Sequence, residues 1–458
     1  MPAILYGKGA YRRANGNLPE FVLINMFLEA TPSAEAGVVL LSRSGLESHR
    51  TVGSGPIRGL FTQEGTFGGD VFTVSGSGLY RGVTQIGTIA GTGAVSFAAS
   101  ETELLVTAGT TLYSYNGTDT VAVALPDNFH ARAVAYLSGH FIAARSGTHQ
   151  FYWSAPMDGR SWDALDFASA ESEPDHLLDV QVMRGNLYLM GQSSIEPWYY
   201  TGALDLPFSL IQQRLLPQGV IATGCAVELD NTLMWVGSDG LVYRMADVGE
   251  RISDHGIEER VEKSASVSAF GFVHEGHSFY CLRLSQGTWA YDAATGQWSE
   301  WRTYGRGNFA GRSATVQGQR VLLGDDASGT IWTFGNGFSD GGAELVREFT
   351  AAFPLNGGTA TVDSVTVDAN AGRTEHLEGL GVEPKLEMAV SRDAGATWGA
   401  WRSARLGAQG EYRTRTRWNR VGMFDAPGAM FRFRASDPVP LRVSNVLVNE
   451  AGGGRSRA

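Results

Sequence analysis

The sequence has few of the residues that mark disulfide-rich or membrane-spanning proteins. Only two cysteines occur in 458 residues, so no disulfide framework can form. We expect Cys225 and Cys281 to be buried thiols, with a single bridge between them as the alternative. The chain has no run of about 18 apolar residues, so no membrane-spanning helix is predicted. The first residues, MPAILYGKGAYRRANG, lack the apolar core of a signal peptide, and we expect synthesis and folding in the cytoplasm.

The content of charged and turn-forming residues indicates which class of protein this is. Charged side chains make up only 18% of the chain, below the ~25% that is usual in soluble proteins. Glycine is abundant at 59 residues, proline is scarce at 15, and no low-complexity run accompanies the glycine. This combination predicts many tight turns rather than disorder. With 43% hydrophobic residues, the chain can bury a sizeable core.

The charge is divided unevenly along the chain. Residues 385–458 hold 13 basic and 6 acidic side chains, a net charge of +7. The remainder holds 23 basic and 41 acidic side chains, a net charge of −18. An acidic body is not expected to bind DNA tightly, because affinity for DNA depends on neutralising phosphates.

A hairpin pattern repeats along the chain. Seven apolar runs, each followed by a glycine-containing turn and a second apolar run, begin at residues 72, 104, 141, 187, 233, 279 and 321. Three of the intervals are 46 residues, and a repeat of roughly 40–50 residues with several strands is typical of propeller blades. We predict an all-β fold with a β-propeller of six or seven blades over residues 55–345. An array of β-sandwiches with accidental spacing is the alternative.

The chain on either side of the repeat is predicted to fold differently. Residues 1–54 lack the hairpin pattern, and we interpret them as an N-terminal arm that packs on a neighbour. Residues 346–450 contain segments with period-two alternation, such as PKLEMAVSRD and AMFRFRASD, which predict a C-terminal β-sandwich. The last residues, 451–458, are expected to form a flexible tail. The only predicted helix runs from Ile257 to Ser264, with Ser253 or Asp254 as its cap.

The common catalytic motifs are missing from the sequence. There is no HExxH zinc motif, no GxSxG nucleophile elbow and no phosphate-binding GxxxxGK[ST] loop. His274 and His277 occur in the segment HEGH, which has the spacing of a hairpin turn rather than that of a metal site. We therefore expect no metal, no cofactor and no enzyme activity.

Two groups of carboxylates are candidates for the acid and base of a glycosidase. They are Glu171 with Glu173 and Asp175, and Asp325 with Asp326. Both groups lie in turn-like segments, which favours solvated loop charge over catalysis.

The segment SRDAGATW at 391–398 matches the Asp-box pattern S-x-D-x-G-x-T-W, which is seen in sialidases and related β-propellers. We predict that Asp393 accepts backbone N–H groups across a hairpin turn and that Ser391 belongs to the same turn. Gly395 is expected to supply a positive φ, and Trp398 to pack under the turn. In the enzymes that carry this motif it lies away from the active site, so we interpret it as structural.

Arginines alternate with other residues on two predicted strands near the C-terminus. They are Arg413, Arg415 and Arg417 on one strand and Arg432 and Arg434 on the other. Residues two apart on a strand point to the same face, so each set is expected to form a basic face. Arginine without lysine favours an interface with another protein. A solvated face and a DNA-binding face are the alternatives.

Six segments carry a resemblance to a known family. They are GPIRGLF at 55–61, SAESEPDHLLDVQVMRGNLYLMGQSSIEPWYYTG at 169–202, ISDHGIEE at 252–259, SRDAGATWGAWRSARLG at 391–407, RTRTRWNRVG at 413–422 and FRFRASDPVP at 431–440. Together they resemble the packaged-DNA stabilisation proteins of short-tailed phages, which are tail hub or nozzle proteins. The segment at 169–202 is the most specific of the six.

The resemblance implies a structural subunit of the virion tail, made in the host cytoplasm. Members of that family form a homo-oligomeric ring, commonly a hexamer, below the portal and its adaptor, and they contact other tail proteins. They retain packaged DNA and form part of its exit channel, so double-stranded DNA would pass without tight binding. The resemblance carries over no catalytic residue, cofactor, small-molecule substrate or membrane span. In this reading the acidic body lines or flanks the channel, and the arginine faces meet another virion protein.

Two other function classes stay open on the sequence. The first is a sialidase-like propeller that binds or cleaves glycans, based on the Asp box and on aromatic residues such as Trp198, Tyr199 and Tyr200. An arginine triad with a Tyr–Glu pair inside the propeller would favour it. The second is a soluble scaffold or lipoprotein-like binding propeller, which the absence of a signal peptide disfavours.

Overall fold

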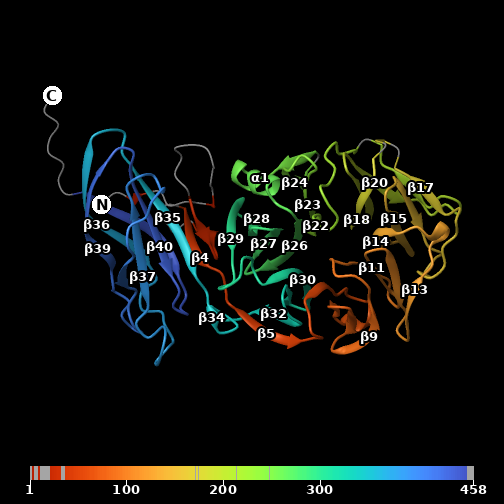
Figure 1. Cartoon of the computed structure of the whole chain (residues 1–458), viewed down its shortest axis with the longest axis horizontal. Helices are drawn as coiled ribbons and strands as arrows, with labels where there is room; N and C mark the ends of the chain where they lie inside the picture. Colours follow the sequence, from red (N-terminus) through yellow and green to blue (C-terminus); the bar gives the residue numbers. More distant parts are fainter. Residues whose placement is uncertain are drawn as a thin grey trace.

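Seven groups of four antiparallel strands form the blades of a β-propeller (Figure 1). Five blades are separate sheets, and the sixth and seventh are parts of larger sheets. The computed structural model describes residues 3–4, 9–10, 21–31, 37–170, 172–173, 175–212, 214–246 and 248–450. The first blade contains β6 (Ile57–Phe61), β7 (Phe72–Ser75), β8 (Gly78–Arg81) and β9 (Thr84–Thr88). The second contains β10 (Ser96–Ala99), β11 (Leu104–Ala108), β12 (Thr111–Tyr115) and β13 (Thr120–Val123). The third contains β14 (Ala131–Leu137), β15 (His140–Arg145), β16 (Gln150–Trp153) and β17 (Phe167–Ser169).

The remaining four blades follow in the same order. They are β18 (Leu177–Met183), β19 (Asn186–Gly191), β20 (Ile195–Tyr200) and β21 (Phe208–Leu210); β22 (Val227–Leu229), β23 (Thr232–Val236), β24 (Val242–Met245) and β25 (Gly249–Arg251); β26 (Val267–His274), β27 (His277–Leu284), β28 (Gly287–Asp292) and β29 (Gln297–Trp301); and β30 (Gly311–Gln317), β31 (Arg320–Asp325), β32 (Thr330–Phe334) and β5 (Leu46–Thr51). The prediction of an all-β propeller is confirmed, with seven blades.

The seven predicted hairpins are the second and third strands of the seven blades. The run that begins at Phe72 forms β7 and β8, and the run that begins at Val321 forms β31 and β32. These two strands are the middle of each blade, so they are covered on both sides by strands and on both faces by neighbouring blades. This explains why they read as nearly continuous apolar runs in the sequence.

Strand β19 shows how one blade packs against two neighbours. Successive side chains point to opposite faces of a strand. Leu187 and Leu189 therefore join the core shared with the third blade, while Tyr188 and Met190 join the core shared with the fifth blade. A blade cannot bury both faces alone, so each is stabilised by its neighbours on either side.

The N-terminal segment differs from the predicted arm. Its described strands pair within the chain, where β5 supplies the fourth strand of the last blade by pairing with β32. Strands β3 (Met26–Ala30) and β4 (Val38–Ser42) join one sheet of the sandwich, and β2 (Leu23–Ile24) joins the other. The segment lacked the hairpin pattern because β5 and β2 find their partners far along the chain instead of forming hairpins.

The C-terminal domain is a β-sandwich of two sheets. One sheet has the order β3-β4-β41-β36-β39, with β1 (Ala3–Ile4) on β41, and the other contains β2-β35-β40-β37-β38. The strands not yet bounded are β35 (Arg347–Pro354), β36 (Thr359–Ala369), β37 (Lys385–Ser391), β38 (Arg402–Arg405), β39 (Thr416–Asp425), β40 (Gly428–Ala435) and β41 (Arg442–Glu450). Alternating apolar residues such as Phe431, Phe433, Val446 and Val448 fill the space between the sheets.

A continuous sheet joins the two domains. Strand β2 pairs in parallel with β29 of the sixth blade through Ile24 and Glu300, and antiparallel with β35 of the sandwich. Short strands β33 (Ser339–Asp340) and β34 (Ala343–Glu344) lead from the last blade to β35. The N-terminal segment is therefore built into both domains and into their junction (Figure 1).

The other described elements are few. A single α-helix, α1 (His255–Glu262), begins at Asp254, whose side chain accepts the N–H of Ile257. Two 3-10 turns cover Phe67–Gly69 and Pro126–Asn128. No helix in the described part of the chain is long and apolar enough to cross a membrane. Cys225 and Cys281 are both free and buried, and the predicted tail at 451–458 lies outside the described residues.

A buried ion pair holds the junction of the two domains. Arg43 and Asp340 form a two-point pair with N–O distances of 2.9 and 2.6 Å, and their side chains are 0% and 2% exposed. Arg43 also donates to Asn25 Oδ1, and Asp340 also accepts the N–H of Leu46 at the start of β5. The pair therefore positions the strand that closes the propeller.

We predict that Arg43→Met destabilises the protein by about 3–5 kcal/mol, because Asp340 would be left as an unpaired buried charge. The double variant Arg43→Met with Asp340→Asn should lose less than the sum of the two single variants, since the residues are coupled. Chemical denaturation measures both.

Lys263→Met on α1 is a matched control, because Lys263 and Glu259 form an exposed pair and such pairs contribute roughly 0–1 kcal/mol. Equal losses for Arg43→Met and Lys263→Met would contradict the role given to the buried pair.

Candidate functional site

The Asp-box segment forms a tight turn in the connection between β37 and β38. Asp393 Oδ1 accepts the backbone N–H of Thr397 at 2.8 Å, and its other oxygen accepts the Thr397 hydroxyl at 2.5 Å. Ser391 Oγ donates to Asp393 and accepts the N–H of Gly395 at 2.8 Å. Gly395 has φ +96°, a region that favours glycine. These bonds are local, and the carboxylate points to its own turn rather than to a cavity.

Two arginine–tryptophan pairs follow the turn on the outer face of the same sheet. The guanidinium of Arg432 lies 5.9 Å from the ring of Trp398, and that of Arg434 lies 4.3 Å from the ring of Trp401. Arg432 also pairs with Glu348, and Arg434 pairs with Glu387 at 2.7 Å. The predicted basic face at Arg432 and Arg434 is therefore largely neutralised by carboxylates of the adjacent strands.

The other predicted arginine set is arranged differently from the sequence expectation. Arg413 and Arg415 lie in the turn before β39, which begins only at Thr416. Both are exposed and have no hydrogen-bond or ion-pair partner among the described residues. Arg417 lies on β39, is half-buried, and donates to Ser364 Oγ at 2.7 Å. Arg413 and Arg415 are thus the free cations of the predicted interface.

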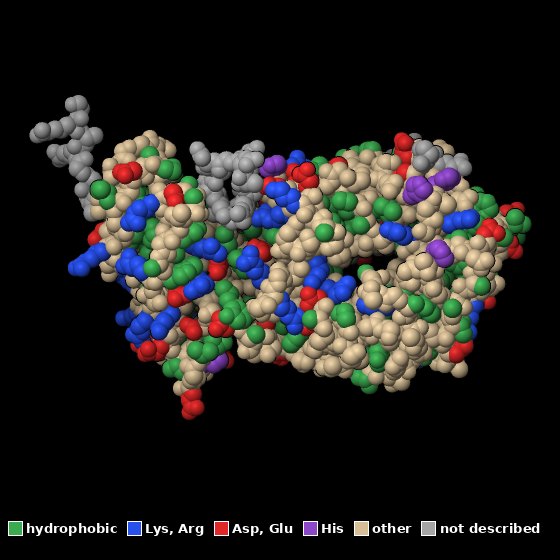
Figure 2. All heavy atoms as spheres, in the orientation of Figure 1, with side chains coloured by type: hydrophobic (Ala, Val, Ile, Leu, Met, Phe, Trp, Pro, Cys, Tyr) green, Lys and Arg blue, Asp and Glu red, His purple; other side chains and the backbone are tan. Residues whose placement is uncertain are grey.

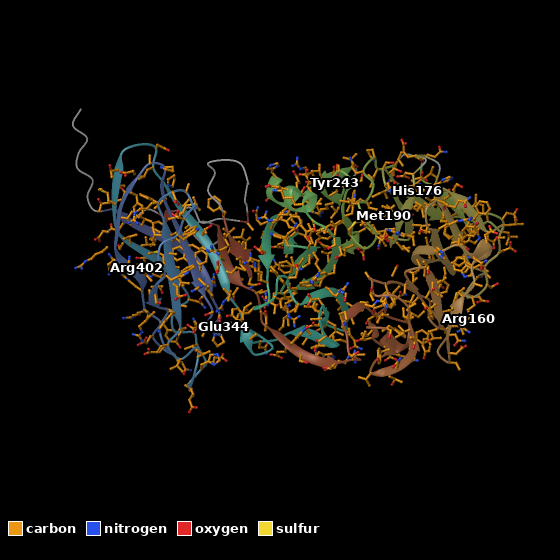
Figure 3. All side chains as sticks on the ribbon, in the orientation of Figure 1. Arg160, His176, Met190, Tyr243, Glu344 and Arg402 are labelled. Atoms are coloured by element: carbon orange, nitrogen blue, oxygen red, sulfur yellow. The ribbon has the colours of Figure 1, made fainter. Side chains whose placement is uncertain are left out.

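Basic side chains gather over the sandwich in the space-filling view (Figure 2). Figure 3 places Arg402 on this domain, at the start of β38. Its guanidinium donates to the Asn419 carbonyl at 2.7 Å, and no described carboxylate pairs with it. Arg402, Arg413 and Arg415 are exposed cations within residues 385–458, the segment with net charge +7.

Sequence reasoning missed the role of His277. It lies on β27 after the turn that joins β26 and β27, where His274 and His277 face each other in register. Its Nδ1 lies 2.9 Å from Asp292 and its Nε2 lies 2.7 Å from Glu29 on β3. It therefore links the sixth blade to the N-terminal strand of the sandwich. The HEGH segment showed the turn, and its partner Glu29 is too far along the chain to be seen in a local pattern.

Three of the five carboxylates considered as catalytic groups, Asp175, Asp325 and Asp326, have structural partners. Asp325 pairs with Arg306 and accepts the N–H groups of Ala327 and Ser328. Asp175 accepts the N–H of Ser194, and Glu171 lies outside the described residues. Among the described residues no group of three or more His, Cys, Asp or Glu could hold a metal ion.

The segment at 169–202 is held together by Glu196. This carboxylate is 1% exposed. It accepts the N–H of Ser172 at 2.7 Å and the indole N–H of Trp198 at 3.1 Å. Glu196 therefore joins the connection before β18 to strand β20. This contact gives the segment at 169–202, the most specific part of the family resemblance, a structural role within the fourth blade.

We predict that Asp393→Asn loosens the turn, because hydrogen bonds from Thr397 and Ser391 to the carboxylate lower the pKa of Asp393 to about 2. Its contribution to stability is then present above the unfolded value near 3.9 and is lost as the pH falls through about 2. Amide exchange at Thr397 should be faster in the variant at pH 6. Unchanged exchange at Thr397 would contradict the bonding described.

A second prediction concerns His277. The hydrogen bond to Asp292, helped by Glu29, raises the pKa of His277 to about 9 against the effect of burial. Its contribution is fully present below about pH 6.5 and is lost as the pH rises through 9. We expect wild type to lose about 1–2 kcal/mol more stability than His277→Gln between pH 7 and 9.5, since exposed Glu29 is screened. Parallel pH profiles of unfolding would refute the assignment.

Two solved structures show a distant likeness to the chain. The chain is similar to the computationally designed Ika8 protein, with 12% identity and a TM-score of 0.40 over 72% of this chain and 99% of that one. It is also similar to the extracellular domain of the one component system BT4673 from B. thetaiotaomicron, with 11% identity and a TM-score of 0.44 over 92% of this chain and 62% of that one. Both scores are below 0.5, so neither likeness identifies a function.

Comparisons with families and relatives are more specific. The chain is 23% identical over 290 residues to the tail hub protein gp10 of Salmonella phage P22, which covers 57% of this chain and 61% of that relative. The chain thus spans about three fifths of the length of the relative it matches. Residues 3–338 match the family model of the bacteriophage P22 Gp10 β-propeller, and residues 346–450 match that of its β-sandwich. Because these matches cover both domains, the chain belongs to the bacteriophage P22 Gp10 family.

Proposed function

We propose that this chain is a non-enzymatic structural subunit of a phage tail hub, located in the virion tail. The observation that carries the proposal is the family match over both domains in their order along the chain. The relative from phage P22 is a tail hub protein. Asp175, Asp325 and Asp326 are engaged in a turn and in ion pairs, which agrees with a structural role.

The subunit is proposed to form a ring, with a hexamer as the expected size. A head-to-tail ring needs two different surfaces on each subunit. Exposed apolar side chains occur on both domains: Leu204 is 99% exposed beside β20 of the propeller, and Leu377 is 78% exposed in the sandwich. Such residues on separate domains could supply the two halves of one repeated contact.

DNA is proposed to pass through a central channel that the subunits of the ring form together, rather than through the middle of one propeller. The inner strands of the blades line a cavity of about 710 Å³, which is in the range of a small-ligand pocket, ~300–1,000 Å³. A duplex therefore needs a wider channel, formed by several subunits. The net charge of −18 outside residues 385–458 would let phosphates slide past with little release of counterions.

The exposed arginines of the sandwich are proposed to contact the portal, its adaptor or another tail protein. Guanidinium groups suit such contacts because they bind carboxylates with two hydrogen bonds and stack on aromatic rings. Arg413 and Arg415 are free for this role, whereas Arg432 and Arg434 would contribute through the pairs they already form with Glu348 and Glu387.

The propeller cavity has one of the two features expected of the sialidase-like alternative, the three arginines, but its described lining residues lack the tyrosine. Three arginines line it, Arg58, Arg132 and Arg312, together with the carboxylates Asp179 and Glu228. The lining of this cavity includes no tyrosine to act with a glutamate as the nucleophile pair. We therefore do not propose glycan cleavage.

We predict that Arg413→Glu with Arg415→Glu leaves the subunit folded and soluble but reduces its incorporation into tails, with a larger loss at low salt. Each rim contact contributes only ~0.2–1 kcal/mol, so the defect should be partial. The measurement is the amount of subunit in purified virions, with negative-stain images of the assemblies.

The control is Arg184→Glu with Arg214→Glu, which makes the same charge change at exposed positions of the propeller. Equal incorporation of the two double variants would contradict an interface at the sandwich. Wild-type subunit should bind duplex DNA weakly at ~0.15 M salt. Tight binding that is lost only in the sandwich variant would make this domain a DNA-gripping surface instead.

A further inference from the structure

The innermost strands of three blades place an arginine at the same irregular position. In β6 the register skips Arg58 between Ile57 and Gly59, and in β30 it skips Arg312 between Gly311 and Ser313. In β14 the register shifts between Ala131 and Val134, the segment that contains Arg132. Such β-bulges leave a residue outside the ladder and redirect its side chain, and they often occur next to functional sites.

The three arginines come from different blades but line one cavity. Arg58, Arg132 and Arg312 all border the propeller cavity of about 710 Å³. Because the blades are repeats of one unit, the second residue of each inner strand lies at the same level around the cavity. The space-filling view shows an opening in the propeller with Lys or Arg side chains at its edge (Figure 2).

Arg58 is a buried cation without a carboxylate partner. It is 3% exposed, and its guanidinium donates to the carbonyls of Gly93, Gly76 and Ala90 at 2.7, 3.1 and 3.0 Å. These bonds give the guanidinium N–H groups acceptors, but the positive charge is stabilised only by carbonyl dipoles and not by a carboxylate. A Cβ at Gly59 beside it would lie 2.6 Å from Val95 and 2.7 Å from the ring of Phe97, so a side chain there would require these two side chains to shift. The hydrogen bonds to three carbonyls hold the Arg58 guanidinium in place.

Arg312 adds a second charge beside Arg58. It is half-buried, and among the described residues its guanidinium has no hydrogen-bond or ion-pair partner. Asp326, whose charge raises the pKa of Arg312, is already paired with Arg283 and Arg306. Burial lowers the pKa of both Arg58 and Arg312, and Arg312 further lowers the pKa of Arg58. Two like charges thus share a partly desolvated wall.

The other charged side chains of the cavity are only partly neutralised. Arg132 Nε donates to Thr223 Oγ1 at 2.7 Å, so its terminal nitrogens remain available. The buried carboxylate Asp179 accepts the N–H groups of Gly224 and Val180 at 2.9 and 2.8 Å and makes no ion pair with Arg132. Glu228 is exposed. The cavity therefore holds more unpaired guanidinium donors than carboxylates placed to use them.

We propose that the propeller cavity is a binding site for a small oxyanion, a phosphate or carboxylate group held by Arg312 and Arg132 with Arg58 behind them. Arginine suits this ligand because its planar fork matches the oxygens of phosphate and carboxylate. The site goes beyond the structural role proposed above, and its ligand is a small molecule or a side-chain-sized group, since the cavity is too small for a duplex.

The test is calorimetric titration of the full chain with inorganic phosphate, and separately with acetate, at low ionic strength. We expect phosphate to bind the wild-type protein. It should bind Arg312→Gln and Arg132→Gln at least about tenfold more weakly, because a tenfold loss of affinity corresponds to removing one contact of ~1.4 kcal/mol. Acetate binding with the same dependence on these residues would support the site and identify a carboxylate ligand. Circular dichroism checks folding, and exposed Arg132 gives a variant that leaves the core intact.

Arg402→Gln is the matched control, because Arg402 is an exposed arginine on the sandwich, far from the cavity (Figure 3). Its affinity for phosphate should equal that of wild type. The proposal is wrong if neither anion binds wild type, or if Arg312→Gln and Arg132→Gln bind as tightly as Arg402→Gln.

Discussion

Closure of the propeller depends on the pairing of β5 with β32. The last blade contains only β30, β31 and β32 from its own stretch of sequence, and its fourth strand comes from the N-terminal segment. The pairing brings Leu46 next to Phe334, so a long loop must close before these contacts stabilise the fold. Without β5, the last blade would expose the edge of β32 and part of its apolar face.

The same constraint links the sandwich to the propeller. Strands β2, β3 and β4 precede β5 in the chain and belong to the two sheets of the sandwich. Arg43 lies between β4 and β5 and pairs with Asp340, while His277 joins the sixth blade to Glu29 of β3. The N-terminal segment therefore cannot move from one domain without disturbing the other. This arrangement favours a rigid subunit.

Local patterns predicted the hairpins and the Asp-box turn, because their determinants lie within a few residues. Glycine turns between apolar runs located the middle strands of all seven blades, and Asp393 with Gly395 located a turn. The closing strand and the partners of Arg432 and Arg434 could not be predicted this way. Those partners, Glu348 and Glu387, lie on neighbouring strands that are distant in sequence.

The arginine faces show a second limit of period-two reasoning. Arg413, Arg415 and Arg417 alternate perfectly in sequence, yet β39 begins only at Thr416. The glycine-containing turn that precedes the strand extends through the first two arginines, so they lie on an exposed loop. For an intermolecular contact this placement is favourable, since loop side chains are free of the pairing that neutralises strand arginines.

The cavity arginines occupy a repeated position in the sequence that the net charge of the domain does not reveal. Residues outside 385–458 have a net charge of −18, but three of the seven inner strands begin with IRG, ARA and GRS, each with arginine second. Aligning the blades by their inner strands would have revealed this repeat, whereas averaging charge over the domain removed it. In the proposed tail hub, the acidic body and the arginine-lined cavity would meet different ligands. The body would face a passing duplex that it should not bind, and the cavity would admit only anions small enough to enter the propeller.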